Sequence, residues 1–285
     1  MKFRAFIQRH PIVSYFCMVF TISWGGAFLV VAPELLRGEA ISTIQGLLMF
    51  PIMLLGPSIA GCTMTAIVDG RKGLRALLSR MGRWRVGVRW YAVLLIPPTL
   101  TLMVLLTMKA LVSPVYTPHL MLLGIVYGLT PGFLEEIGWT GYVFPKMQAK
   151  LGTLPAGLLL GAIWGLWHAP VVDFLGAAYP HGSYWLPFYL AFIAMVMAVR
   201  ILIIWLYRNT NSVLLPQLLH GSFTGFLVIL SPAPITPAQE TLWYATYAVA
   251  LWIAVAFIVK YSKSFVRQPA QQPAQVQAME PTYTR

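Results

Sequence analysis

Charged residues are scarce in this chain of 285 residues: they make up 10% of it, and only eight residues are acidic. A soluble domain of this length carries roughly a quarter charged residues. Hydrophobic residues make up 58% of the chain, and several apolar runs of about 20 residues are each long enough to cross the hydrocarbon core as a helix. The composition excludes an ordinary soluble domain and predicts an all-α, polytopic transmembrane helical bundle.

Cysteine is also rare, and no disulfide framework is expected. Cys17 and Cys62 both lie in apolar runs, which is typical of small buried hydrophobic residues. The formal net charge of +12 could indicate a nucleic-acid-binding protein. The basic residues lie between apolar runs, however, as topology signals do, so we expect no nucleic-acid partner.

The apolar runs predict about eight transmembrane spans, and we expect both termini of the chain to be cytoplasmic. They lie near residues 11–32, 44–68, 90–111, 119–144, 155–176, 186–207, 212–231 and 241–260. We expect one transmembrane domain over residues 1–265 with a motif core at 119–231, because no polar stretch is long enough to bury a core of its own. The Pro- and Gln-rich segment 266–285 is typical of a disordered cytoplasmic tail.

The positions of lysine and arginine predict this orientation. With the N-terminus inside, all basic residues except Arg37 and Lys109 fall on inner segments or inner span ends. Because cytoplasmic loops carry an excess of Lys and Arg, we expect both termini in the cytoplasm. The sequence shows no recognisable targeting signal and its helical layout is compact, so we expect a multi-pass protein of the cell inner (plasma) membrane. The basic loop 69–89 would contact anionic lipid, or could instead dock a substrate or partner.

Four polar residues inside the predicted spans form a candidate active site. Glu135 and Glu136 are adjacent in the fourth span, His168 lies in the fifth and His220 in the seventh. A carboxylate in hydrocarbon costs several kcal/mol unless it is paired, protonated or facing water. A lone intramembrane histidine is often only a hydrogen-bond partner between helices. Here, however, three helices bring two carboxylates and two imidazoles to a similar depth in the cytoplasmic half of the bilayer, as an active site requires.

These residue types fit the hydrolysis of an amide bond by water. A glutamate in a low-dielectric cavity can take a proton from water, and a histidine can orient it or stabilise a developing oxyanion. Glu135, His168 and His220 are also the number and kind of ligands found at zinc sites. The sequence contains no HExxH and no GxSxG motif, which argues against an ordinary zincin or a serine hydrolase.

Three motifs in this order resemble those of the CAAX-protease and bacteriocin-processing family, which includes the Ras-converting CAAX endopeptidase. The first is a Glu-Glu pair followed by an aromatic residue, in EEIGWTGY starting at Glu135. The second is an aromatic residue four positions before a histidine, here Trp164 and His168. The third is a histidine with a hydrogen-bonding residue four positions later, here His220 and Thr224.

The resemblance implies an endopeptidase whose cavity opens to the cytoplasm or the inner leaflet and takes a peptide or membrane-protein substrate. It implies that Glu135 is the base that activates water, with Glu136, His168 and His220 in support. No cofactor is then required, although many relatives are called metalloproteases and zinc stays an open alternative. The oligomeric state is left open.

Two positions depart from the family pattern. Thr140 stands where the first motif usually has arginine, and Thr224 stands where the third usually has asparagine. Thr224 can still donate a hydrogen bond. We expect Arg200, in span six, to replace the lost cation beside the glutamates, unless it snorkels to the headgroups. Trp139 and Trp164 are interpreted as packing around the cavity.

Two other classes of function stay open. A non-catalytic member of the same fold could act as a bacteriocin-immunity factor or as a membrane scaffold, and the two threonines would then be signs of decay. A transporter could use a proton-coupled glutamate pair, although no repeat relates the two halves of the chain.

Overall fold

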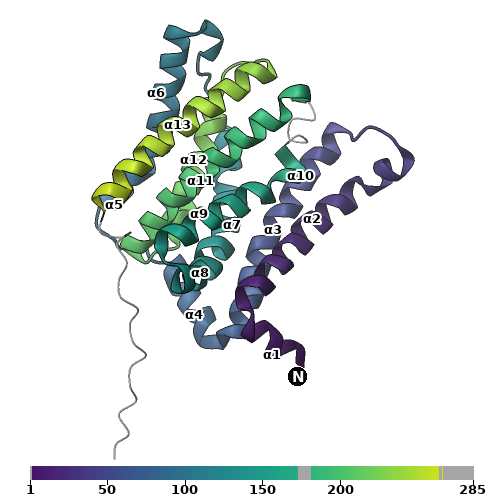
Figure 1. Ribbon diagram of the computed structural model, residues 1–285, viewed down its shortest axis with the longest axis vertical. Coiled ribbons are helices and arrows are strands. Elements are labelled where there is room, and N and C mark those ends of the chain that lie inside the picture. Colours follow the sequence, from purple (N-terminus) through teal and green to yellow (C-terminus); the bar gives the residue numbers. More distant parts are fainter. Residues whose placement is uncertain (1, 173–180, 263–264, 266–285) are drawn as a thin grey trace, which may run out of the picture.

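The computed structural model describes residues 2–172, 181–262 and 265, and Figure 1 shows their arrangement as a bundle of helices. In these ranges the only β-type pairing is an isolated antiparallel bridge between Pro118 and Pro232. Five helices in them are long and apolar enough to cross a membrane. The predicted all-α polytopic membrane bundle is therefore confirmed. The predicted tail 266–285 lies outside the described residues.

The helices match the predicted spans in order. The long ones are α2 (Pro11–Arg37), α3 (Thr43–Val68), α5, η1 and α6 (Arg89–Ala92, Val93–Leu95, Ile96–Leu111), α11 (Trp185–Thr210) and α13 (Pro237–Tyr261). The shorter ones in the bundle are α7 (Gly124–Gly138), the π-helical turn η3 (Trp139–Val143), α8 (Phe144–Leu151), α9 (Thr153–Trp167), α10 (Ala169–Val172) and α12 (Leu214–Ile229). Outside the bundle core lie α1 (Lys2–Arg9), α4 (Gly70–Met81), η2 (Pro114–Tyr116) and η4 (Gly182–Tyr184).

Two predicted boundaries are wrong. The fourth span begins at Gly124 instead of residue 119, because the preceding backbone pairs with the end of α12: Met121 N donates to Ile229 O at 2.9 Å. The fifth span ends as a regular helix at Trp167, and α10 continues it only to Val172. The predicted remainder, 173–176, lies outside the described residues.

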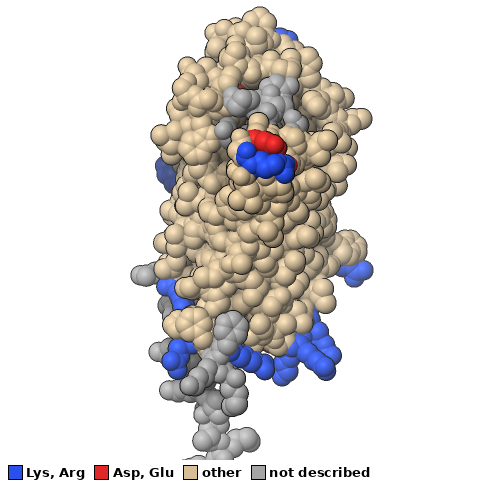
Figure 2. All heavy atoms as spheres, turned by 90° about the vertical axis from the view of Figure 1, so that its right-hand side faces the viewer, with Lys and Arg blue, Asp and Glu red and all other residues tan. Residues whose placement is uncertain are grey.

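One end of the bundle, which we call the basic end, gathers α1, α4 and the connections 82–88 and 211–213 (Figure 1). Ser212 Oγ donates to Arg83 O at 2.7 Å, so two of these connections are in contact. Figure 2 shows lysine and arginine gathered toward this lower end, below a broad band of uncharged side chains. Cytoplasmic loops of membrane proteins carry an excess of Lys and Arg. The distribution of these residues therefore predicts that the basic end is cytoplasmic.

The opposite end, which we call the far end, carries the connections 38–42, 112–123 and 230–236. Helices α3 and α13 both start there at capping boxes. Ser42 and Thr236 accept hydrogen bonds from the backbone of the third helical residue, and that residue's glutamine side chain bonds back. Each capping box satisfies N–H groups that the first helical turn would otherwise leave unpaired.

Glycine lets α7 and α12 pack closely. A Cβ at Gly124 would lie 2.6 Å from Gly225 O, and one at Gly128 would overlap Gly221 O. Gly124, Gly128 and Gly132 recur every four residues and therefore lie on one face of α7. Small residues at this spacing let helix backbones approach in a membrane. This approach brings the polar residues of α12 beside the glutamates of α7.

We expect Gly128→Ala to destabilise the bundle by about 1–3 kcal/mol, because the added methyl group must push α12 away from α7. The matched control is Gly25→Ala in α2, where an added Cβ meets nothing within 4 Å. The midpoint of thermal unfolding in detergent should fall for the first variant and stay unchanged for the second. Equal midpoints for both variants would show that the two helices can adjust without cost.

Candidate active site

Three of the predicted catalytic residues face one cavity. Glu135 of α7, His168 after α9 and His220 of α12 line a cavity of about 580 Å³. Glu135 and His220 are only 1% and 2% exposed. Most of the remaining lining is apolar or aromatic, including Pro131 and Phe192. The predicted convergence of the three helices is therefore present, with the polar groups in an otherwise apolar space.

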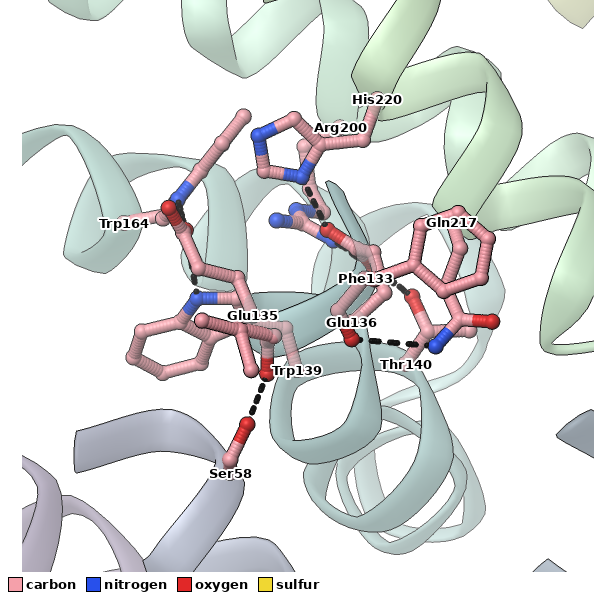
Figure 3. Close-up of polar contacts among 11 residues, drawn as sticks. Ser58, Phe133, Glu135, Glu136, Trp139, Thr140, Trp164, Arg200, Gln217 and His220 are labelled. Atoms are coloured by element: carbon pink, nitrogen blue, oxygen red, sulfur yellow. Dashed lines mark hydrogen bonds and ion pairs between the residues drawn. The ribbon is translucent and has the colours of Figure 1, made fainter. Parts of the chain in front are cut away.

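Two tryptophans hold one oxygen of Glu135. Trp139 Nε1 donates to Oε2 at 3.1 Å, and Trp164 Nε1 donates to the same oxygen at 2.7 Å (Figure 3). Hydrogen bonds to a carboxylate are charge-assisted and stronger than neutral ones. Within the described ranges Oε1 has no hydrogen-bond partner, and the residue lines the cavity. The carboxylate is therefore fixed on one side and available on the other.

Glu136 points away from the cavity into a polar cluster. Its Oε2 pairs with Arg200 Nη1 at 2.8 Å and accepts a hydrogen bond from the Thr140 hydroxyl. Its Oε1 lies 2.9 Å from His220 Nδ1. Arg200 is fully buried and does not snorkel, so the expected pairing of Arg200 with Glu136 is present.

Trp164 connects this buried cluster to the cavity. The Arg200 guanidinium carbon lies 4.2 Å from the centre of the Trp164 ring, and the His220 ring centre lies 5.0 Å from it. A cation over an indole face is stabilised by the ring quadrupole. Trp139 and Trp164 thus do more than pack around the cavity, because both also donate their indole N–H groups to Glu135.

The two histidines present the same ring nitrogen to the cavity. His168 Nδ1 lies 2.7 Å from Trp164 O. A carbonyl only accepts hydrogen bonds, so Nδ1 carries the proton and Nε2 is left for the cavity. His220 Nδ1 faces the Glu136 carboxylate, which likewise only accepts when ionised. As neutral rings, both histidines therefore offer Nε2 as an acceptor.

The threonines at the two atypical positions have different surroundings. Thr224, one helical turn after His220, lines the cavity. Thr140 is fully buried and bonds to Glu136 instead. At the first atypical position, the hydrogen bond to Glu136 comes from Thr140 and the positive charge comes from Arg200 on another helix.

A zinc site does not fit these side chains as they stand. Among the residues that the structure describes, no three or more His, Cys, Asp or Glu side chains lie close enough to hold a metal ion. One oxygen of Glu135 already accepts two indole N–H bonds. The structure gives no support to a zinc site formed by Glu135, His168 and His220. The steps proposed below therefore use no metal.

Sequence reasoning missed two polar residues beside the glutamates. Ser58 of α3 donates through Oγ to Leu134 O, and Gln217 of α12 donates through Nε2 to Phe133 O at 3.0 Å (Figure 3). Both bonds go to backbone carbonyls just before Glu135. They tie α7 to its two neighbours at the level of the site. The signal in the sequence that could have found them is the presence of a serine and a glutamine within apolar runs.

We expect Trp164→Phe to lower the activity of the site by about 10- to 100-fold, because a hydrogen bond to a charged group contributes about 1.5–3 kcal/mol. The matched control is Trp167→Phe, since Trp167 Nε1 is buried without a partner among the described residues. Cleavage rates of both variants, compared at equal thermal stability, check the expectation. Equal losses in the two variants would assign the effect to packing instead of to the indole N–H.

The cavity runs from the glutamate toward the far end. Its lining includes Met121, Ser231 and Glu240, which lie in the far-end connections or in the first turn of α13. The turn η3, which follows the glutamates toward the basic end, is buried and contributes nothing to the lining. The resemblance implies a cavity that opens to the cytoplasm or the inner leaflet, and the side on which this cavity opens stays a prediction.

Comparison with known proteins finds two similarities, the first of which covers this site. Residues 117–226 match the family described as type II CAAX prenyl endopeptidase Rce1-like, and this segment contains all four predicted catalytic residues. The chain is 30% identical over 134 residues to CAAX prenyl protease 2 of Methanococcus maripaludis, an alignment that covers 45% of this chain and 46% of that relative. The chain thus spans about half the length of the curated relative that it matches. Over this segment, the multi-pass membrane protein is similar to CAAX proteases.

Proposed function

We propose that the protein is an intramembrane endopeptidase of the CAAX type, in which Glu135 activates the water that attacks a peptide bond. The proposal rests on how the two oxygens of the Glu135 carboxylate are bonded. Two indole N–H groups bind its Oε2, while Oε1 has no partner among the described residues and the side chain lines an apolar cavity. A general base must lie within reach of the proton that it takes, and a water in this cavity would meet that condition.

The proposed reaction assigns a place to each proton. Glu135 takes a proton from water, the resulting hydroxide attacks the carbonyl carbon, and the proton then passes to the leaving amine. Charge that develops on the carbonyl oxygen needs a donor in the cavity. The Thr224 hydroxyl supplies one, and His168 or His220 supplies another when its ring is protonated.

The buried cluster supports this chemistry from behind. Arg200 and Thr140 hold Glu136, and Glu136 in turn binds His220 Nδ1. A side chain whose partners are themselves fixed loses little freedom when it binds a substrate, which is the advantage of a preorganised site. We therefore propose Glu136 and Arg200 as positioning residues and not as groups that touch the substrate.

The reaction is proposed to need no metal. A fluorogenic peptide library offered to the full chain in liposomes, with and without a strong zinc chelator, tests both parts of the proposal. We expect cleavage that persists in the presence of chelator, because no described set of side chains is arranged to hold zinc. Loss of cleavage on chelation, restored by added zinc, would replace the proposal by a metalloprotease mechanism.

A scaffold or immunity protein is the alternative. This alternative interprets the two atypical threonines as signs that a catalytic site has decayed. Thr140 and Arg200 together bind Glu136, which argues against decay at the first position. Folded wild-type protein that binds peptides of the library without cutting them would favour the scaffold. A transporter would move its substrate across the liposome membrane and cut no bond.

The substrate and the membrane are also proposals. A peptide or a membrane-protein segment fits the mostly apolar lining of the cavity, and the bilayer itself is implied by the long apolar helices. We expect the inner (plasma) membrane as the location. We propose the cytoplasmic leaflet as the place of the cut.

A further inference from the structure

We infer that α4 is a membrane-surface helix that binds anionic lipid headgroups, and that Arg80, its last basic residue, couples the position of this helix to the buried cluster around Glu136. Arg80 is then a positioning residue, since none of its hydrogen-bond partners lines the cavity. Neither role depends on the reaction proposed above.

Helix α4 is tethered to the membrane at both ends. It begins at Gly70, directly after the spanning helix α3 ends at Val68, and only the connection 82–88 separates it from the span that begins at Arg89. Figure 1 shows it at the end of the bundle. A segment held this closely between two spanning helices lies at the level of the lipid headgroups. Its exposed side chains therefore meet the membrane surface.

The exposed surface of α4 and of the connection after it is both basic and apolar. Residues 70–89 contain seven basic residues and no acidic one. The large apolar side chains of Leu78, Trp84 and Val88 are exposed among them. Basic residues interleaved with apolar ones are typical of helices in a membrane interface, and basic clusters beside a span bind anionic lipid. The apolar side chains favour a bilayer over a soluble acidic partner, because a soluble partner would leave them in water.

Arg80 joins this surface to three elements of the site. Its Nη2 donates to Gly141 O in η3 at 2.8 Å, and its Nη1 donates to the hydroxyl of Tyr207 in α11. Its carbonyl accepts a hydrogen bond from Val213 N, just before α12, at 2.9 Å. The buried Leu77 adds packing, since a Cβ at Gly141 would lie 2.6 Å from Leu77 Cδ1. The end of α4 thus holds the π-helical turn, α11 and the start of α12 together.

Each element that Arg80 holds carries one partner of Glu136. The turn η3 carries Thr140, α11 carries Arg200 and α12 carries His220. In α11 and α12 the residue that contacts Arg80 lies seven positions from that partner, which is about two helical turns. Rigid helices carry such coupling over a distance. A displacement of α4 would therefore reach all three partners of Glu136.

Anionic headgroups would stabilise the docked position of α4. The exposed basic side chains of this helix are close together and repel one another, and Asp69 beside them is already paired with Lys146 at 2.9 Å. Negative headgroups offset this repulsion and hold the helix on the surface. A ligand that binds better to the docked helix shifts the equilibrium toward docking. By reciprocity, loss of the Arg80 contacts must weaken the effect of lipid on the site.

Exchange of the Val213 amide proton measures docking directly, because this amide donates to Arg80 O. We would compare the full chain in nanodiscs of phosphatidylcholine alone and of phosphatidylcholine mixed with phosphatidylglycerol. The anionic lipid should slow exchange of this amide by about tenfold or more, since several basic residues face the negative surface. The Gly152 amide donates to Gln148 O at the same 2.9 Å outside α4 and should not respond. Equal exchange of the Val213 amide in the two nanodiscs would overturn the inference.

Two triple variants separate α4 from the general surface charge. Each replaces three exposed basic residues by glutamine, the first in α4 and the second, as the matched control, in α1 and α8. The two sets are Arg71, Lys72 and Arg75, and Arg4, Arg9 and Lys150. The first variant should lose most of the response to phosphatidylglycerol and the second should keep it. Equal responses of the two variants would contradict a binding surface on α4.

Arg80→Gln tests the coupling. Its Val213 amide should exchange quickly in both nanodiscs, because the side-chain bonds to Gly141 and Tyr207 are lost. A lipid response as large as that of the wild type would overturn the role of Arg80. Poly-glutamate that protects the amide in phosphatidylcholine as well as phosphatidylglycerol does would replace the lipid by an acidic partner. A lipid response in a protein that cuts no peptide would support this role of α4 and count against the proposed function alone.

Discussion

Replacing Arg200 by methionine is expected to destabilise the protein by about 3–5 kcal/mol, because it leaves Glu136 as an uncompensated buried charge. Both side chains are fully buried, and the two atoms of the pair lie 2.8 Å apart. Methionine fills a similar volume but supplies no charge. The midpoint of thermal unfolding in detergent should fall by many degrees, and peptide cleavage should fall with it as His220 loses its anchored partner.

Two controls separate the lost pair from general damage. Arg37→Gln removes an exposed arginine whose pairs with Glu34 and Glu39 lie at the surface, where ion pairs contribute at most about 1 kcal/mol. The double variant Arg200→Met with Glu136→Gln removes both buried charges and should recover much of the lost stability. A midpoint for Arg200→Met equal to that of Arg37→Gln would contradict the importance of the buried pair.

Much of the bundle could be predicted because the membrane imposes simple rules on the sequence. A helix must be long and apolar to cross the hydrocarbon core, so the long helices α2, α3, α11 and α13 follow from their apolar runs. Buried charge is costly, so Glu135, Glu136 and Arg200 stood out as residues that need partners. The pairing of Arg200 with the glutamates was expected because Thr140 stands where the family motif usually has arginine and because Arg200 lies at a similar depth.

The contacts between helices could not be predicted in the same way. The stripe of Gly124, Gly128 and Gly132 is visible in the sequence, yet its partner α12 is not, because packing between distant segments leaves no local pattern. The indole bonds from Trp139 and Trp164 were missed for the same reason, since a tryptophan in a membrane is usually apolar packing. The direction in which the cavity extends depends on which halves of the surrounding helices lie apart from one another.

Glu135→Gln is expected to lower kcat/KM for peptide cleavage by about 10²- to 10⁴-fold, the range in which a general base contributes. An amide cannot take the proton from water. Its oxygen can still accept the N–H groups of Trp139 and Trp164, which bond Oε2 in the wild type, so we expect the fold and the cavity to persist. Peptide affinity should change little.

The matched control is Glu39→Gln. Glu39 is exposed and pairs with Arg37 at the far end, away from the cavity lining. It removes the same charge with the same change of atoms, and its effect on cleavage should be less than about twofold. A large loss for both variants would point to the membrane surface charge and not to Glu135.

The most direct test of the account is the cleavage rate of one peptide by the wild type and by Glu135→Gln, in the same liposomes, with peptide affinity and thermal unfolding measured on the same samples. The account predicts a loss of about 100-fold or more in kcat, with affinity and unfolding midpoint unchanged. A Glu135→Gln protein that cuts the peptide within a fewfold of the wild-type rate would contradict Glu135 as the base.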